Sequence, residues 1–575
     1  MKRHTKIFIL SLCGLTLIGL LMLIFTSQSR FQKFCNEFFQ EEMAGNTLTL
    51  HYTVTDPEKY GIDPSKITLG SYDFNKSAQK RSLIGKTLTL QTISREQLSK
   101  DLQKTYDLLK YSLKTELERL DYTLLEEPLV PSIGIQSQLP ILLAEYSFSH
   151  EADVINYLTL LGCVPEYFDS LIALEEEKIE AGLFMDNATA NELITYCEEF
   201  LSEKETHFLV ETFAERLDSL TLDSQKKTSY ITENASVLEN SVFPAYEKLK
   251  SFLTENQNAG HNSDGLFYSP NGTDYYAWLL RSEIGVDHSF EEIESVLENA
   301  LKKDAETIAA LTKENPDVLS ERQNITFDTS NPAALTAYLA KRAEHDFPEI
   351  PEVTVEIRDV PKSMEPHLSP AFYLVPPIDN SDENVVYLNN GYLKDNLSFF
   401  TTLAHESYPG HLYQTVFENS TNPHPIERLL YFGGYTEGWA TYAEHLSYFY
   451  APISEDLASL LSATRSMTLN LYSHLDLYIH AYGWTEEDCS AYLKKFGITN
   501  AASIHDMFLL VKQQPANYLK YYLGYLEICN LKEKAQSFLG NDFNLKKFHE
   551  FILSYGPAPF ELLENYLEDW LKTSN

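Results

Sequence analysis

The chain has 575 residues, of which 43% are apolar, so it can bury a large core. Its formal net charge is −38, with 45 Lys and Arg against 83 Asp and Glu. Because nucleic-acid binding needs a basic surface that neutralises phosphate, this acidic balance argues against a nucleic-acid partner.

The N-terminus is predicted to be a signal anchor within residues 1–30. The basic start MKRHTK precedes residues 7–25, which carry no charge. As a helix this run would span roughly 28 Å, close to the thickness of a bilayer core. A poor cleavage sequence after it favours an uncleaved anchor over a cleaved signal. Residues 31–575 are therefore expected to form one extracytoplasmic domain, which is tethered to the membrane or, if the signal is cleaved, secreted.

Five cysteines follow the anchor, and none belongs to a CxxC pair. An odd number argues against a complete disulfide framework. It leaves room for one bridge, such as Cys163 to Cys197. The cysteines are otherwise expected in the core rather than as metal ligands.

Most of the chain reads as helix. Residues 97–126 have apolar positions at spacings of three and four. Ser289 and Glu292 form a capping-box pattern before a helix that should extend to about residue 315. Residues 485–496 are predicted to form a helix that ends at Gly497.

Short segments rich in aromatic and β-branched residues predict a small sheet. These segments are residues 47–55, 352–358, 371–376 and 385–388. Helical signal resumes near Leu397. The expected fold is mainly α, with a small sheet just upstream of the helix that carries the chemistry.

The segment TTLAHESYPGHLYQ contains the residues of a candidate metal site. Two histidines flanking a glutamate are typical of zinc hydrolases, in which the glutamate is the general base. Here His405 and His411 are six residues apart, and on a regular helix their rings would point roughly 120° apart. Pro409 and Gly410 can break the helix and return His411 to the metal. The spacing therefore predicts an irregular backbone between Glu406 and His411.

A third metal ligand is expected on the next helix. Glu437 follows His411 by 26 residues, in the segment YTEGWATYAEH. Glu444 lies seven residues further on the same helical face, so it is either a competing ligand or a carboxylate that orients a histidine. From the residues alone, a structural Pro-Gly turn followed by an amphipathic helix with Trp439 in the core remains an alternative.

The pattern His405-Glu-x-x-Pro-Gly-His411 followed by Glu437-Gly-Trp-Ala resembles the bacterial family known as domain of unknown function 885. That family is similar to the gluzincin metallopeptidases, in which two His and one Glu hold zinc. The resemblance covers most of the chain after the anchor, and it implies a large helical gluzincin-like fold and peptidase chemistry. Zn²⁺ would be held within residues 397–450, with supporting C-terminal helices in residues 465–535.

In this interpretation Glu406 takes a proton from the attacking water and delivers it to the leaving amine. An oxyanion stabiliser is also needed, and the candidates are Tyr521 and His480. Tyr522 is an adjacent rival of Tyr521. His480 follows Asp476 by four residues, so on a helix the carboxylate could orient the imidazole.

Three functions are compatible with these residues. The first is a zinc peptidase that cleaves oligopeptides outside the cytoplasm, with residues 371–373 pairing with the extended substrate. The second is a metal-dependent amidase with the same ligands and a small non-peptide substrate. The third is an inactive, membrane-tethered binding protein. The sequence predicts neither the oligomeric state nor endo- versus exopeptidase action.

Overall fold

The computed structural model describes residues 26–72, 76–202, 204–322, 325, 331–360, 362, 365, 368–392 and 396–573. The apolar run of the predicted anchor, residues 7–25, lies outside this part of the chain. Within it, α6 (Glu151–Ala181) is long and apolar enough to cross a membrane by composition. However, α6 contributes Val154, Leu161 and Leu171 to a protein core, so it is a core helix here.

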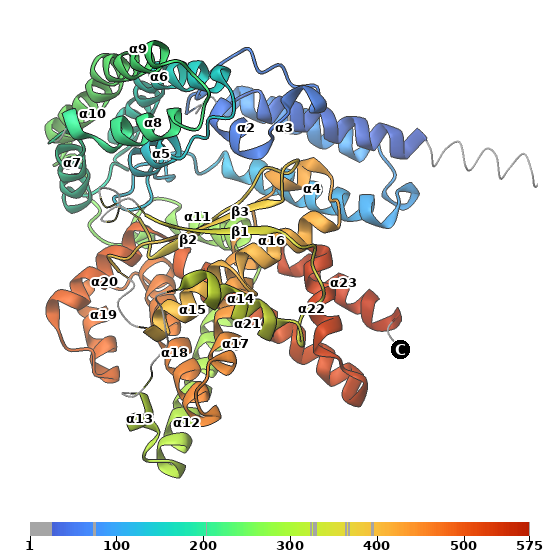
Figure 1. Cartoon of the computed structure of the whole chain (residues 1–575). Coiled ribbons are helices and arrows are strands. Elements are labelled where there is room, and N and C mark those ends of the chain that lie inside the picture. Colours follow the sequence, from blue (N-terminus) through green and yellow to red (C-terminus); the bar gives the residue numbers. More distant parts are fainter. Residues whose placement is uncertain are drawn as a thin grey trace, which may run out of the picture.

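The chain folds into two groups of helices with a small sheet between them (Figure 1). The first group is α2 (Thr47–Thr53), α3 (Lys76–Gln91), α4 (Lys100–Arg119), α5 (Ile135–Ala144), α6, α7 (Asn187–Ser202), α8 (Phe208–Leu217), α9 (Ser224–Val237) and α10 (Phe243–Asn256). The second group begins with α11 (Gly272–Leu279), α12 (Phe290–Glu314), α13 (Val318–Glu321) and α14 (Pro332–Ala343). After the sheet it continues with α15 (Asn396–Glu406), α16 (His411–Ser420), α17 (Gly433–Tyr450), α18 (Glu455–Tyr482), α19 (Glu486–Leu493), α20 (Ala501–Gln513), α21 (Asn517–Leu539), α22 (Leu545–Tyr555) and α23 (Phe560–Thr573).

The sheet has three strands, β1 (Thr354–Asp359), β2 (Ala371–Leu374) and β3 (Glu383–Leu388), in the order β1-β3-β2. β1 runs parallel to β3, and β2 runs antiparallel to it. Because successive side chains of a strand point to opposite faces, each face packs on a different core. One face contacts the core of the first helical group through Phe372, Leu374, Val385 and Tyr387. The other contacts the core of the second group through Ala371, Tyr373, Val386 and Leu388.

The predictions from local sequence patterns are mostly confirmed. Ser289 and Glu292 form both hydrogen bonds of the capping box at the start of α12. α19 starts after its cap Thr485, and the helical segment that contains it ends at Gly497, whose φ is +82°. The helix predicted over residues 97–126 is shorter, because α4 covers only Lys100–Arg119.

One predicted strand is wrong, and one possible disulfide is not formed, in agreement with the expectation that the cysteines are core residues. Residues 47–55 do not form a strand: the Asn46 side chain accepts hydrogen bonds from Leu48 and Thr49 and starts helix α2. The cap satisfies the first backbone N–H groups of the helix from within the segment. A strand would need a neighbouring strand to satisfy the same groups. Cys163 and Cys197 do not form a disulfide, since every cysteine of the described residues is free.

Helices α17 and α21 cross at backbone contact. A Cβ on Gly438 would lie 2.4 Å from the carbonyl carbon of Gly524, and a Cβ on Gly524 would lie 2.0 Å from the oxygen of Gly434. Real side chains do not tolerate such distances, so glycine is required at the crossing. This contact places Glu437, next to Gly438 on α17, beside the first turns of α21.

Candidate metal centre

Three side chains from three helices converge at one point. The candidate ligand atoms of His405 at the end of α15, His411 at the start of α16 and Glu437 on α17 all lie within 4.8 Å of one another. Glu437 Oε2 lies 3.6 Å from His405 Nε2 and 3.4 Å from His411 Nε2. Two ligands bound tetrahedrally to zinc are separated by about 3.4 Å, given bonds of about 2.1 Å. The three predicted ligands therefore already have separations suited to one zinc ion.

The turn between α15 and α16 brings His411 to this point. α15 ends at Glu406 and α16 begins at His411, so the predicted irregular backbone between them is confirmed. The N–H of Gly410 donates to the carbonyl of Ala404 at 3.0 Å, which folds the turn back onto α15. Trp439 Nε1, one residue after Gly438 on α17, donates to the carbonyl of Pro409 at 2.9 Å. The indole thus ties the turn to the helix that carries Glu437.

The residues present fit a divalent cation. Glu437 Oε2 is buried and has no hydrogen-bond partner, although it faces both imidazoles. Burial alone would raise the pKa of Glu437, but the charges of His411 and His405 hold it well below its usual range. Burial would lower the pKa of His405, but the carboxylates of Glu437 and Glu444 raise it to about 10. An unpartnered buried carboxylate beside two imidazoles is a donor set that suits zinc.

The positions of Glu437 and Glu444 indicate which of them is the third candidate ligand. Glu444 Oε2 faces the other ring nitrogen of His405, Nδ1, at 3.7 Å. Arg465 on α18 holds this carboxylate with Nε at 2.8 Å and Nη2 at 3.3 Å. Burial would raise the pKa of Glu444, but Arg465 and His405 lower it to about 2. Glu444 is thus placed to orient His405, and Glu437 is the third member of the cluster.

We expect Glu444→Gln to weaken zinc binding by about 10–100-fold, because the carboxylate that orients a metal-binding imidazole has effects of this size. The measurement is zinc affinity by competition with a chromogenic chelator. Glu418→Gln is a matched control: Glu418 is also buried and paired with an arginine, Arg428 at 3.0 Å. An equal loss of affinity in both variants would contradict a specific role for Glu444.

Glu406 is held by the sheet. Its Oε2 accepts a hydrogen bond at 3.0 Å from the backbone N–H of Tyr373, on the outer edge of β2. This contact holds the carboxylate of Glu406 in place, and the charge of Glu406 acts on His405 and raises its pKa. The contact also occupies the N–H of Tyr373, so the predicted pairing of β2 with a substrate would have to use other backbone groups of the strand.

Tyr521 lies at the centre and Tyr522 does not. The Tyr521 ring is 6.4 Å from the His405 ring, with an interplanar angle of 27°. The charge of Glu437, together with burial, raises the pKa of Tyr521 well above its ordinary value. Tyr522 points elsewhere, where its hydroxyl contacts Ser466 Oγ at 2.8 Å in the core. Of the two adjacent tyrosines, only Tyr521 is placed to act at the metal centre.

His480 is a core residue, contrary to its predicted catalytic role. It is fully buried, with one ring nitrogen facing the N–H of Leu266 and the other the carbonyl of Val511, both at 3.2 Å. Asp476 does not orient it. The Asp476 carboxylate instead accepts hydrogen bonds from the hydroxyl of Tyr276 and from backbone N–H groups at the start of α21. Asp476 therefore positions the helix that carries Tyr521.

Two residues near the centre were not predicted from the sequence. Tyr431 lies in the segment before α17, and 53% of its surface is exposed. Burial of its hydroxyl and, to a smaller extent, the charge of Glu437 raise the pKa of Tyr431. Lys520 precedes Tyr521 on α21, and its Nζ lies 5.8 Å from the Tyr521 ring centroid. The only available signal was the position of Lys520 beside a candidate catalytic tyrosine.

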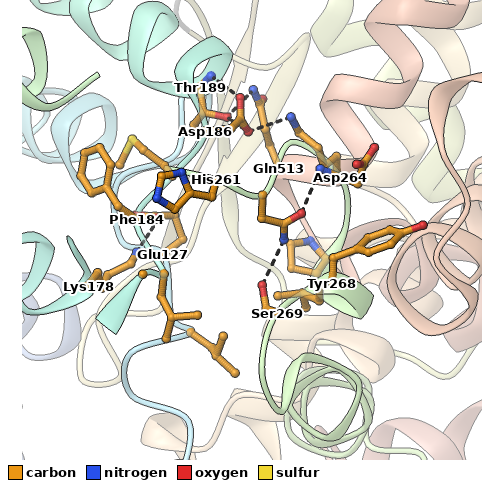
Figure 2. A pocket seen from close by; sticks show the side chains of 18 of the residues that line it. Glu127, Lys178, Phe184, Asp186, Thr189, His261, Asp264, Tyr268, Ser269 and Gln513 are labelled. Atoms are coloured by element: carbon orange, nitrogen blue, oxygen red, sulfur yellow. Dashed lines mark hydrogen bonds and ion pairs between the residues drawn. The ribbon is translucent and has the colours of Figure 1, made fainter. Parts of the chain in front are cut away.

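A separate cavity of about 350 Å³ lies between the two helical groups (Figure 2). Phe184, Asp186 and Lys178 line it from the end of α6 and the segment after it, and Tyr268 and Ser269 line it from the segment before α11. Its cations are already paired, Lys178 with Glu127 and Lys512 with Asp186. None of the three clustered ligands lines this cavity.

Comparison with known proteins identifies a family and several similar solved structures, two of which are described here. The model of a family described as "Bacterial protein of unknown function (DUF885)" matches residues 61–567. A "putative lipoprotein" from Colwellia psychrerythraea is 19% identical, with a TM-score of 0.81 over 95% of this chain and 99% of that one. One of unknown function from Shewanella oneidensis is 16% identical, with a TM-score of 0.66 over 94% of this chain and 99% of that one. No curated protein matches the sequence.

Proposed function

The chain belongs to the bacterial family DUF885, and we propose that it is a zinc-dependent hydrolase, specifically a peptidase that acts on oligopeptides. One observation carries the proposal. His405, His411 and Glu437 meet within 4.8 Å, with the carboxylate of Glu406 fixed beside them. Two histidines, a carboxylate and a neighbouring glutamate are the usual residues of a zinc peptidase.

His405, His411 and Glu437 would hold the ion. Bound zinc would supply a water of lowered pKa and polarise the scissile carbonyl. Glu406 would take the proton of the attacking water and donate it to the leaving amine, while its bond to Tyr373 keeps the carboxylate in place. Tyr521 would donate its hydroxyl hydrogen to the developing oxyanion.

The side chains of the three candidate ligands are 13–16% exposed, which suits catalysis better than a structural role. Structural zinc sites are closed by four protein ligands, whereas catalytic sites keep a position open for water and substrate. We also propose that the fold is gluzincin-like. The catalytic domain would lie outside the cytoplasm, tethered by residues 1–30. The naming of two structurally similar proteins as "putative lipoproteins" is consistent with that location.

An amidase with a non-peptide substrate would use the same ligands and base, so it differs only in the pocket. An inactive binding protein would have no use for a carboxylate held beside the metal. The hydrogen bond that holds the Glu406 carboxylate in position therefore favours an enzyme over a binding protein.

The proposal is tested by the zinc content of the purified full-length protein. We expect close to one zinc per chain in the wild type and less than a tenth of that in His411→Ala, which removes one of three ligands. His150→Ala is the control, because its side chain is 84% exposed and remote from the cluster in sequence. A wild-type protein that binds no zinc when it is supplied would contradict the proposal.

A further inference from the structure

Lys520, Tyr431 and Tyr521 form a polar group beside the metal centre. Lys520 Cδ and Tyr431 Oη lie 2.4 Å and 2.9 Å from the point that a Cβ on Gly433 would occupy, so both side chains rest on this glycine at the start of α17. Figure 1 shows α17 and α21 side by side, which is how residues from two distant segments meet here. Because the hydroxyl of Tyr521 is proposed to serve the oxyanion, we call only Lys520 and Tyr431 the anion site.

The polar ends of the anion site form no hydrogen bond or ion pair within the described part of the chain, and Lys520 Nζ contacts only the ring of Tyr521. Among the described residues, the hydroxyls of Tyr431 and Tyr521 make no hydrogen bond, and Lys520 forms no ion pair. Lys520 does act on the charge of Glu283, a carboxyl whose pKa burial raises despite the opposing effect of Lys520. An ammonium and hydroxyl donors without acceptors suit a negatively charged ligand group.

Another cation close to Tyr521, Arg465, is already neutralised. Arg465 is committed to Glu444 through two hydrogen bonds. In a chain of net charge −38, an unpaired lysine next to a catalytic centre is an exception to the overall balance. Lys520 therefore provides a positive charge for an anion beside the centre, although the chain as a whole is strongly negative.

We propose that the anion site binds the C-terminal carboxylate of the peptide substrate, so that the enzyme removes residues from a free C-terminus. This inference rests on the proposed peptidase function. The ring separation of 6.4 Å from His405 to Tyr521 and the 5.8 Å from Tyr521 to Lys520 Nζ place the ammonium at most about 12 Å from the His405 ring. An extended peptide advances about 3.3–3.6 Å per residue. The substrate therefore has about three residues or fewer between the cleaved bond and its C-terminal carboxylate.

The test uses two peptides of one sequence, one with a free C-terminal carboxylate and one with a carboxamide. We expect the full-length wild type to cleave the acid with a kcat/KM at least tenfold higher, as for a hydrogen bond to a charged group. Lys520→Gln should lose this preference, because its kcat/KM should fall for the acid but not for the amide. Lys520→Arg should keep part of the preference for the acid. Lys534→Gln removes a charge from the same helix, where Lys534 pairs with Glu564, and should keep the preference in full.

An acidic side chain is a second source of the same chemistry. A third peptide, amidated and ending in Asp, separates the two sources. Preference for this peptide over the free acid would overturn the assignment to the C-terminal carboxylate. So would equal cleavage of the acid and the amide by the wild type.

A binding measurement keeps the inference apart from the proposed function. Full-length, zinc-loaded Glu406→Gln is titrated calorimetrically with the acid and the amide. We expect at least tenfold tighter binding of the acid, lost in the double variant with Lys520→Gln. Equal binding of both peptides, or binding of neither, would overturn the inference. A wild type that binds the acid selectively but cleaves no peptide would instead contradict the peptidase.

Discussion

Glu406→Gln should lower peptide hydrolysis by about 10²–10⁴-fold while zinc remains bound, because a positioned general base contributes a factor of this size. The substitution keeps the shape of the side chain. The amide oxygen of Gln can still accept the hydrogen bond that Tyr373 donates to Glu406 at 3.0 Å. What is lost is the ability to take a proton from water at neutral pH.

The measurement is kcat of the wild type and the variant, with zinc content and melting temperature taken on the same samples. Glu455→Gln, an exposed change in the first turn of α18, is the matched control and should leave all three values unchanged. Full activity in Glu406→Gln would exclude this residue as the base. Loss of zinc together with activity would assign Glu406 to metal binding instead.

The cluster of His405, His411 and Glu437 was predictable because its residues lie in two short segments. His405, Glu406 and His411 share one segment, and Glu437 lies in the second. The chemistry of these residue types suggests one metal before any fold is known. Local capping likewise predicted the starts of α12 and α19, because a cap is satisfied within four residues of itself.

The role of His480 was not predictable, because it depends on contacts between distant segments. A spacing of four shows only that Asp476 and His480 share a helical face. In the fold, the Asp476 carboxylate is taken by the start of α21 and by Tyr276, 200 residues earlier. No local pattern distinguishes a carboxylate that orients a catalytic imidazole from one that binds the end of another helix.

The same limit applies to the anion site and to the choice between Glu437 and Glu444. Lys520 and Tyr431 meet only because α17 and α21 cross at glycines, and the sequence does not show which helices pair. Both glutamates lie on one face of α17, and Arg465 from α18 holds Glu444 beside Nδ1 of His405, away from the Nε2 that faces Glu437. Tertiary contacts decided each of these cases.

Gly410→Ala should weaken zinc binding by tenfold or more and destabilise the fold by about 1–3 kcal/mol, the usual cost of forcing extra atoms into a packed interior. A Cβ at this position would lie 1.7 Å from the carbonyl oxygen of His405 and 2.6 Å from that of Ala404. Both are backbone atoms, so no side-chain rotation relieves the clash. The turn must open, and His405 and His411 must separate as it does.

Zinc affinity and the free energy of unfolding of the zinc-free protein measure the two effects separately. Gly85→Ala is the control, because a Cβ there meets no atom within 4 Å and the residue lies inside α3. Alanine at such a helical site should stabilise the protein by about 0.5–1 kcal/mol. If Gly410→Ala kept full zinc affinity, the folded-back turn would not be what brings the second histidine to the metal. Another element would then have to hold His411, and Trp439, which ties Pro409 to α17, is the residue placed to do so.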